Sequence, residues 1–419
     1  MSLVSGLGAR IGPIRFPVEL TCLIGLALTL PLVEAPKNLF CVLFCLAWLF
    51  NRLRAHSFGG PWRGWDTLIG LWLASGFVVA AGAAIHHNEW EGAFDLVRYG
   101  LPLWCLSRAG YQRANYLLVF GALIASTLIG LAWGYADVAS GRRYWLELNS
   151  VGHVNHSAIY LAIMLGATLG LCIAYWSTMR QTVRAACLIS VVIMTGSLII
   201  MASRGAFGAA VIMVLLITAG WLPRSRSAAI MLALTTVLIA AGTLLSHSPV
   251  MQKNSDSIRL AGVLSNRDKI WRTAWEEWRR HPVFGVGMDN YSLIDAPHFD
   301  AESQARGEHF DPDQIQFYPH AHNLLLNTLT ERGLVGTLPL TAVLMAWAYS
   351  LWRRRPQPRS AALGCATWAA ALSALAVTLV AGMANTTLHH EHGILCAILL
   401  GLWLDQCRPE HSAAPIGET

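Results

Sequence analysis

The stretch FYPHAHNLLLNTLTERGLVG, residues 317–336, places side chains that can move a proton at the start of an apolar segment. His320, His322 and Asn323 stand close together there. A histidine can take the proton of a hydroxyl as that hydroxyl attacks, because the pKa of a free imidazole is about 6.5. The alternative interpretation is that these histidines cap a helix or lie among lipid headgroups.

Three arginines that are far apart in the sequence are candidates for binding an anion. Arg204, in MASRGAFG, lies between two apolar segments, where a guanidinium costs free energy unless it pairs or reaches the headgroups. Arg267 and Arg272 belong to a predicted helix, and Arg267 lies near its N-terminus, where the dipole favours an anion. Guanidinium groups bind phosphate oxygens in a bidentate manner, so the three predict a pyrophosphate clamp. For the two helix arginines the alternative is a solvated basic face that anionic lipid attracts.

Other groups that resemble metal or catalytic motifs have simpler interpretations. Asp311-Pro-Asp313 looks like a DxD metal motif, but a proline between two aspartates is typical of a turn. The run HHEH at 389–392 lacks the spacing of HExxH, which favours a polar lining at a helix mouth. The 9 cysteines form no CxxC motif. We therefore predict no metal site and no cofactor.

The composition indicates that lipid surrounds most of the chain. Of 419 residues 55% are hydrophobic and 13% are charged, whereas an ordinary soluble domain has about 25% charged residues. The 17 tryptophans suit an aromatic belt at two membrane interfaces. The net charge of +6 is no sign of a nucleic-acid partner, because basic residues in short loops orient membrane proteins.

Apolar runs long enough to span a bilayer predict an all-α integral membrane protein with about twelve transmembrane helices. The runs lie at 17–33, 38–52, 67–85, 92–109, 115–135, 156–178, 183–202, 205–222, 228–246, 333–352, 361–384 and 390–406. The fourth run contains Asp95 and Arg98, which are three residues apart and are expected to pair.

Basic residues concentrate in every second connection, which predicts that those loops and both termini are cytoplasmic. In a Gram-negative cell, the long loop at 248–320 then lies on the periplasmic side of the inner membrane. The predicted parts are 1–247 with nine spans, 248–332 with the loop and the catalytic motif, 333–406 with three spans, and 407–419 as a short cytoplasmic tail.

Within the loop, residues 265–281 predict an amphipathic helix suited to lying on a bilayer, with a stripe of tryptophans along one face. Ser265 with Asp268 is an N-cap signal, and Pro282 ends the helix in a turn. A second short helix, 322–332, leads into the tenth span, and Gly333 is expected to be its C-cap or a kink.

Three segments together resemble the O-antigen ligase and polymerase superfamily: NRDKIWRTAWEEWRRHPVFGVGMDNY, HAHNLLLNTLTERGLVG and SRGAFG. The resemblance covers the whole topology and is sharpest over 260–336. It implies a GT-C-type glycosyltransferase architecture with a large helical periplasmic loop between the ninth and tenth spans. It also implies an inverting, metal-independent transfer of a glycan from undecaprenyl diphosphate to an acceptor hydroxyl at the periplasmic face.

The resemblance also implies roles for particular residues. His322 matches the catalytic histidine of the family, which acts as the general base, and Arg204 and Arg267 match positions that hold the diphosphate. From the residues themselves we add Arg272, His320 and Asn323 as further substrate-binding candidates.

Four functions fit these features. An O-antigen ligase would transfer O-antigen to a sugar hydroxyl of the lipid A-core in lipopolysaccharide biosynthesis. An O-antigen polymerase would use a lipid-linked glycan as acceptor, and a protein O-oligosaccharyltransferase would use Ser or Thr and often carries a larger soluble C-terminal part. A lipid-linked glycan transporter would need the arginines but no base, and is expected to place charged residues deep in several spans. The ligase is our hypothesis.

Overall fold

The computed structural model describes residues 16–221, 236–237, 266–307 and 311–408, and in these ranges the chain forms helices and no strand. The predicted run at 228–246 lies outside the described residues except for 236 and 237. Each of the other predicted runs coincides with a helix. These are α2 (Pro17–Thr29), α3 (Glu34–Arg54), α4 (Gly64–Gly82), α5 (Glu89–Ser107), α6 (Arg113–Ala139), α7 (Val154–Tyr175), α8 (Gln181–Met201), α9 (Arg204–Trp221), α14 (Leu324–Arg353), α15 (Ala362–Gly382) and α16 (His390–Gln406).

Seven of the described helices are long and apolar enough to cross a membrane, namely α4, α6, α7, α8, α9, α14 and α15. This confirms a helical integral membrane protein, whereas the count of twelve spans stays a prediction. In α5 the expected ion pair is present, with Arg98 Nη2 2.8 Å from Asp95 Oδ1.

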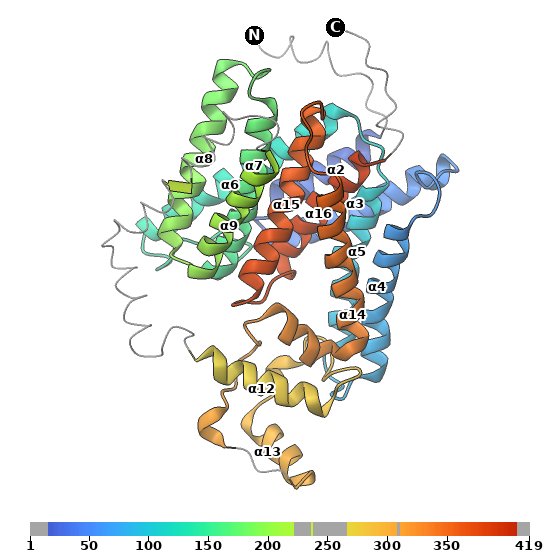
Figure 1. The fold of residues 1–419 in the computed structure, drawn as a ribbon, viewed down its shortest axis with the longest axis vertical. Coiled ribbons are helices and arrows are strands. Elements are labelled where there is room, and N and C mark those ends of the chain that lie inside the picture. The colour runs from blue at the N-terminus through green and yellow to red at the C-terminus, as the bar shows by residue number, and fades with distance from the viewer. Residues whose placement is uncertain (1–15, 222–235, 238–265, 308–310, 409–419) are drawn as a thin grey trace.

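Helices α7 and α15 pack against each other in the middle of the bundle (Figure 1). Their sequences are apolar on every side, which is typical of a helix that other helices surround. Gly170 of α7 allows this close approach, because a Cβ at this position would overlap the Cβ of Ala369 on α15.

Basic residues from several predicted cytoplasmic connections meet at one end of the bundle. Arg108 forms an ion pair with Asp66, with 2.6 Å between Nη1 and Oδ1. Arg408 Nε donates a hydrogen bond of 2.8 Å to the carbonyl of Ser107. These contacts bring the connection after α5, the start of α4 and the end of α16 together.

The loop between α9 and α14 forms a separate unit at the opposite end, with α12 (Arg267–Arg280), the short turn η1 (Tyr291–Leu293), α13 (Ala296–Ala305) and the turn η2 (Pro312–Gln314) (Figure 1). It has a small hydrophobic core of its own, made by Ala274, Val286, Tyr291, Ile294, Phe299 and Ala321. The predicted N-cap Ser265 lies outside the described residues. The residue at the N-cap position of α12 is Asn266, with φ 60°.

Helix α12 buries one face and leaves its tryptophans near the surface. Ile270, Ala274 and Glu277 are buried on the side that packs against α14, whereas Trp275 is 44% exposed. The tryptophan stripe is therefore offset from the buried stripe, so the helix packs on protein and still presents indole rings outward. Its contact with a bilayer stays a prediction.

Helix α14 combines the predicted short helix and the tenth span, and it is broken at Gly333, which has φ 52° and ψ −157°. The segment 282–287 lies in this break and forms backbone hydrogen bonds of 2.9 to 3.0 Å with residues 330–335. A Cβ at Gly333 would overlap the carbonyl of Val283. The expected kink is confirmed, and it connects the end of α12 to the start of α14.

We expect Gly333→Ala to destabilise the protein by about 1 to 3 kcal/mol, because alanine disfavours the left-handed conformation and its Cβ would displace the 282–287 segment. Thermal unfolding of the purified protein in detergent measures the change. Gly364→Ala on α15 is the matched control, since a Cβ there meets nothing within 4 Å. Equal unfolding temperatures for both variants would contradict the proposed role of the break.

Candidate active site

The turn that carries His320 and His322 is fixed by the start of α14. Asn323 is the N-cap of that helix, and its Oδ1 accepts hydrogen bonds of 3.0 Å from the two backbone amides at positions 325 and 326. Asn327 Oδ1 accepts a hydrogen bond of 2.9 Å from the amide of Ala321. Ala321 is fully buried in the loop core. The two histidines therefore stand on either side of an anchored residue.

The two imidazoles lie against each other and against an aromatic ring. The ring centroids of His320 and His322 are 4.1 Å apart, and those of Tyr318 and His322 are 4.7 Å apart. His322 Nδ1 is 3.5 Å from Oδ1 of Asn385, a long contact in which the nitrogen donates. Nε2 of His322 then keeps its lone pair and can accept a proton.

His322 also has a strained backbone, with φ 49°. A left-handed conformation is costly for a residue with a Cβ and is found preferentially at functional sites, where the surroundings impose it. Here the surroundings are the capped start of α14 and the buried Ala321.

Arg267 and Arg204 belong to the same neighbourhood. Arg267 is the first residue of α12, and its positive charge helps to lower the pKa values of His320 and His322. Arg204 is the first residue of α9, and its charge, after burial, lowers the pKa of Arg267. Two helix N-termini therefore bring guanidinium groups toward the histidine pair, and their dipoles add to the positive potential.

Burial is the main reason that the pKa of His322 falls from 6.5 to about 3, and the charges of His320 and Arg267 add to it. Burial likewise lowers the pKa of His320, with His153 and Arg267 contributing. Both imidazoles are therefore neutral at pH 7. A neutral imidazole can accept a proton, whereas an imidazolium cannot.

Two other sequence-predicted residues, Arg272 and Asn323, have partners of their own in the structure. Arg272 lies about 140° around α12 from Arg267, by helix geometry, and its guanidinium donates to the amide oxygen of Gln314 at the exposed surface. Asn323 uses its oxygen for the helix cap, and its amide nitrogen donates to the carbonyl of Met383 at 3.1 Å. The arrangement of Asn323 suits holding the turn rather than contacting a substrate.

The discounted Asp-Pro-Asp motif is a turn, as expected. Asp311 Oδ1 accepts a hydrogen bond of 3.0 Å from the amide of Asp313, and both residues are exposed. By contrast, the HHEH run contributes more than a polar lining, because His389 and His392 approach His156 at the start of α7.

Sequence reasoning missed several residues beside the histidine pair. Tyr318 and Asn385 contact His322, and the charge of His153, the N-cap of α7, affects both site histidines. For His153 the run GHVNH at 152–156 is the feature of the sequence that could have indicated a role, since it places histidines at the start of an apolar segment. Nothing in the sequence shows that α7 begins beside α14.

A polar cavity of about 250 Å³ borders His320. Acidic and basic side chains line it together, from α5, the loop and α14. They include Asp95, Asp289, Glu331 and Arg332. Such a mixture of hydrogen-bonding groups suits a hydroxyl-rich ligand better than an apolar one.

A family model described as O-antigen ligase matches residues 189–341. An O-antigen ligase of Pseudomonas aeruginosa is 28% identical over 321 residues, which cover 73% of this chain and 69% of that protein. The chain is therefore similar to O-antigen ligases over most of its length. The family match contains both arginines and the histidine pair that the fold brings together.

This similarity indicates a glycosyltransferase-type enzyme in a membrane. In this chain the histidine pair stands at the mouth of α14, at the loop end of the helix bundle. The geometry therefore brings a proton acceptor and two cations to one place.

We expect Arg267→Gln to raise the pKa of His322 from about 3 toward, but not to, the ordinary value of 6.5. The sign is upward because a repelling cation is removed, and the shift is partial because burial remains. Histidine chemical shifts in pH titrations of isotope-labelled protein measure it. Arg279→Gln on the exposed face of α12 is the matched control and should leave the pKa unchanged. If His322 titrates in the same way in both variants, Arg267 does not influence the histidine pair.

Proposed function

We propose that this protein is an O-antigen ligase that transfers O-antigen from undecaprenyl diphosphate to a sugar hydroxyl of the lipid A-core. The observation that carries the proposal is the meeting of a neutral imidazole, His322, with the charges of Arg267 and Arg204 at the loop end of the bundle. A hydroxyl acceptor needs a base, and a diphosphate leaving group needs cations.

The proposed reaction is one displacement with inversion at the anomeric carbon. His322 Nε2 accepts the proton of the acceptor hydroxyl as its oxygen bonds to the sugar carbon. The bond from that carbon to the diphosphate oxygen breaks, and the electron pair leaves with the diphosphate. Arg204 and Arg267 stabilise the charge that builds up there. We propose that no metal ion takes part in this step.

A pKa of about 3 makes the imidazole a weak base while the site is empty of anion. The donor itself removes this weakness of the base, because its diphosphate brings negative charge to the cations that repel the proton from His322. Binding of the donor therefore raises the pKa of His322 and strengthens the base. In this way the base becomes effective only when the donor is present.

An apolar cavity of about 540 Å³ between α9, α14 and α15 supports a prenyl-linked donor. Its lining includes Leu216, Gly220, Trp368 and Leu372. Leu216 lies 12 residues after Arg204 on α9, which corresponds to about 18 Å along the helix. A long isoprenoid chain can cover that distance from a diphosphate held near Arg204.

We also propose that the loop end faces the periplasm, in a topology of twelve spans with both termini in the cytoplasm and the GT-C-type architecture. The domain limits are those expected from the sequence: 1–247, 248–332, 333–406 and 407–419. The basic contacts of Arg108 and Arg408 at the other end support this orientation, because short basic loops stay in the cytoplasm.

The polar cavity beside His320 suits the acceptor sugar, because its mixed charges can bind several hydroxyl groups. A polymerase or a protein O-oligosaccharyltransferase would use the same base with a different hydroxyl. Purified enzyme offered lipid A-core, a second lipid-linked glycan and a serine peptide in turn distinguishes these functions. We expect transfer to the lipid A-core alone.

We expect His322→Ala to reduce transfer from an undecaprenyl-diphosphate-linked glycan to the lipid A-core by about 10² to 10⁴-fold, because the general base is lost. Gel separation of the glycosylated product measures the rate. His86→Ala is the matched control, since that side chain is 64% exposed. Transfer at the wild-type rate by folded His322→Ala protein would contradict the assignment of His322 as the general base.

We expect Arg204→Ala and Arg267→Ala each to reduce transfer by about 10²-fold, because each removes a charge that stabilises the leaving group. Binding of undecaprenyl diphosphate should weaken in both, and Arg279→Ala is the control on the exposed face of α12. Normal donor binding and transfer by both site variants would contradict the diphosphate clamp.

A further inference from the structure

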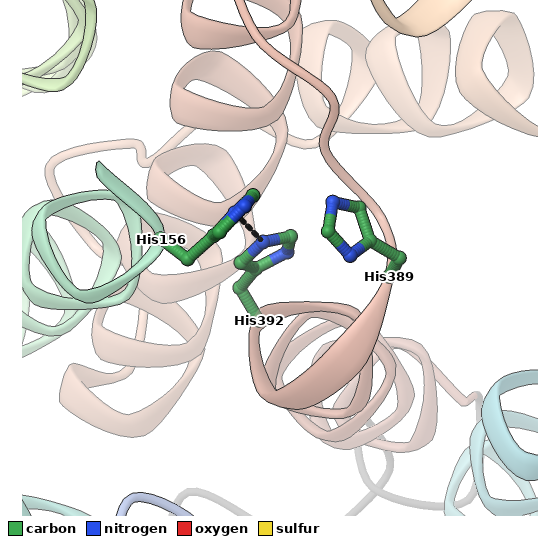
Figure 2. Close-up of side chains that lie close together, drawn as sticks. All are labelled: His156, His389 and His392. Atoms are coloured by element: carbon green, nitrogen blue, oxygen red, sulfur yellow. Dashed lines mark hydrogen bonds between the residues drawn. The ribbon is translucent and has the colours of Figure 1, made fainter. Parts of the chain in front are cut away.

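Three histidines that the proposed transfer reaction does not use meet where α7 and α16 begin (Figure 2). His156 lies in the first turn of α7, His389 is the N-cap of α16, and His392 lies in the first turn of α16. One ring nitrogen from each lies within 4.8 Å of the others. In Figure 2 the three rings converge on one region from these two elements.

The spacing of one pair of these nitrogens fits a tetrahedral metal ion. His392 Nε2 and His156 Nδ1 are 3.3 Å apart. Two nitrogens that bind zinc tetrahedrally at 2.0 to 2.1 Å are separated by about 3.3 to 3.4 Å. The pair therefore needs almost no movement to replace its shared proton with a metal ion.

The third histidine is oriented in the way that metal-binding histidines usually are. His389 Nε2 is 3.1 Å from the carbonyl oxygen of Thr386. A carbonyl oxygen only accepts, so Nε2 carries the proton and Nδ1 keeps its lone pair. A backbone carbonyl that fixes the tautomer of a ligand in this manner is common around metal sites.

The backbone on either side of His389 is strained. Leu388 has φ 60° and His390 has φ 47°, both in the left-handed region. Each such residue costs free energy, and strain of this kind is found preferentially at functional sites. His389 lies between these two strained residues, and one of its ring nitrogens is within 4.8 Å of those of His156 and His392.

We propose that His156, His389 and His392 form a binding site for a transition-metal ion of the zinc class, with a fourth position open to water. Three neutral imidazoles favour zinc, copper or cobalt over magnesium or calcium, which prefer oxygen ligands. The ion would join the starts of α7 and α16. The transfer step proposed above assigns these three histidines no role, although His389 lines the polar cavity beside His320. The metal site is argued from the histidine geometry and does not depend on that function.

A second group of metal-binding residue types, Glu277, His281 and Glu302, has a different character. The guanidinium of Arg280 lies 3.7 Å from Glu277 Oε2 and 3.5 Å from Glu302 Oε2. A positive charge therefore already lies beside both carboxylates. This group serves as the internal comparison for the site of three histidines.

The test uses the full-length protein, purified in detergent without a histidine tag and stripped of metal by a chelator. Mass spectrometry of the metal content after zinc addition and gel filtration gives the stoichiometry, and cobalt gives an absorption spectrum that reports tetrahedral geometry. We expect one zinc ion per chain, a tetrahedral cobalt spectrum and a higher unfolding temperature with zinc than without it.

His156→Gln and His392→Gln should each weaken zinc binding by at least about 100-fold, more than the loss of an outer partner would cause. His281→Gln, in the comparison group, should bind zinc normally. His392→Cys keeps a zinc ligand, so it should restore binding even if the glutamine variant folds poorly. Absence of stoichiometric zinc in the wild-type protein, or loss of binding in His281→Gln alone, would overturn the proposal.

Discussion

The backbone pairing at Gly333 is the interaction on which the site depends. The segment 282–287 follows α12 directly, and it inserts into the break of α14. Because α12 begins with Arg267 and α14 begins just after His322, this pairing fixes the cation relative to the imidazole. A glycine is needed there because any side chain would overlap the carbonyl of Val283.

The proposed catalytic chemistry follows from where helices begin. Arg204 and Arg267 are the first residues of α9 and α12, and His322 precedes the N-cap of α14. Helix N-termini carry partial positive charge and suit an anion, while burial keeps the imidazole neutral. In the proposed function these effects serve a diphosphate and leave one proton acceptor beside it.

The same principle produces the group of three histidines, which also lies at two helix starts. The two groups differ in charge. His320 and His322 stand near guanidinium groups, which favour an anion, whereas the ring nitrogens of His156, His389 and His392 face one another, which favours a metal cation. Neighbouring imidazoles in one membrane protein can therefore serve opposite kinds of ligand.

The sequence by itself determined the helical membrane class, the positions of the apolar helices described and the kink at Gly333, and it named His320, His322, Arg204 and Arg267 as candidates, because hydrophobic runs, glycines and helix-start residues act locally. The helical period also predicts that Arg272 and Arg267 lie on different sides of α12. Only the tertiary structure decided that Asn323 holds a turn, that Tyr318 and Asn385 contact His322, and that His156 meets His392. His156 and His392 are 236 positions apart. Contacts at such separation depend on which helix ends pack together, and that is set by the summed packing of the bundle rather than by any local pattern.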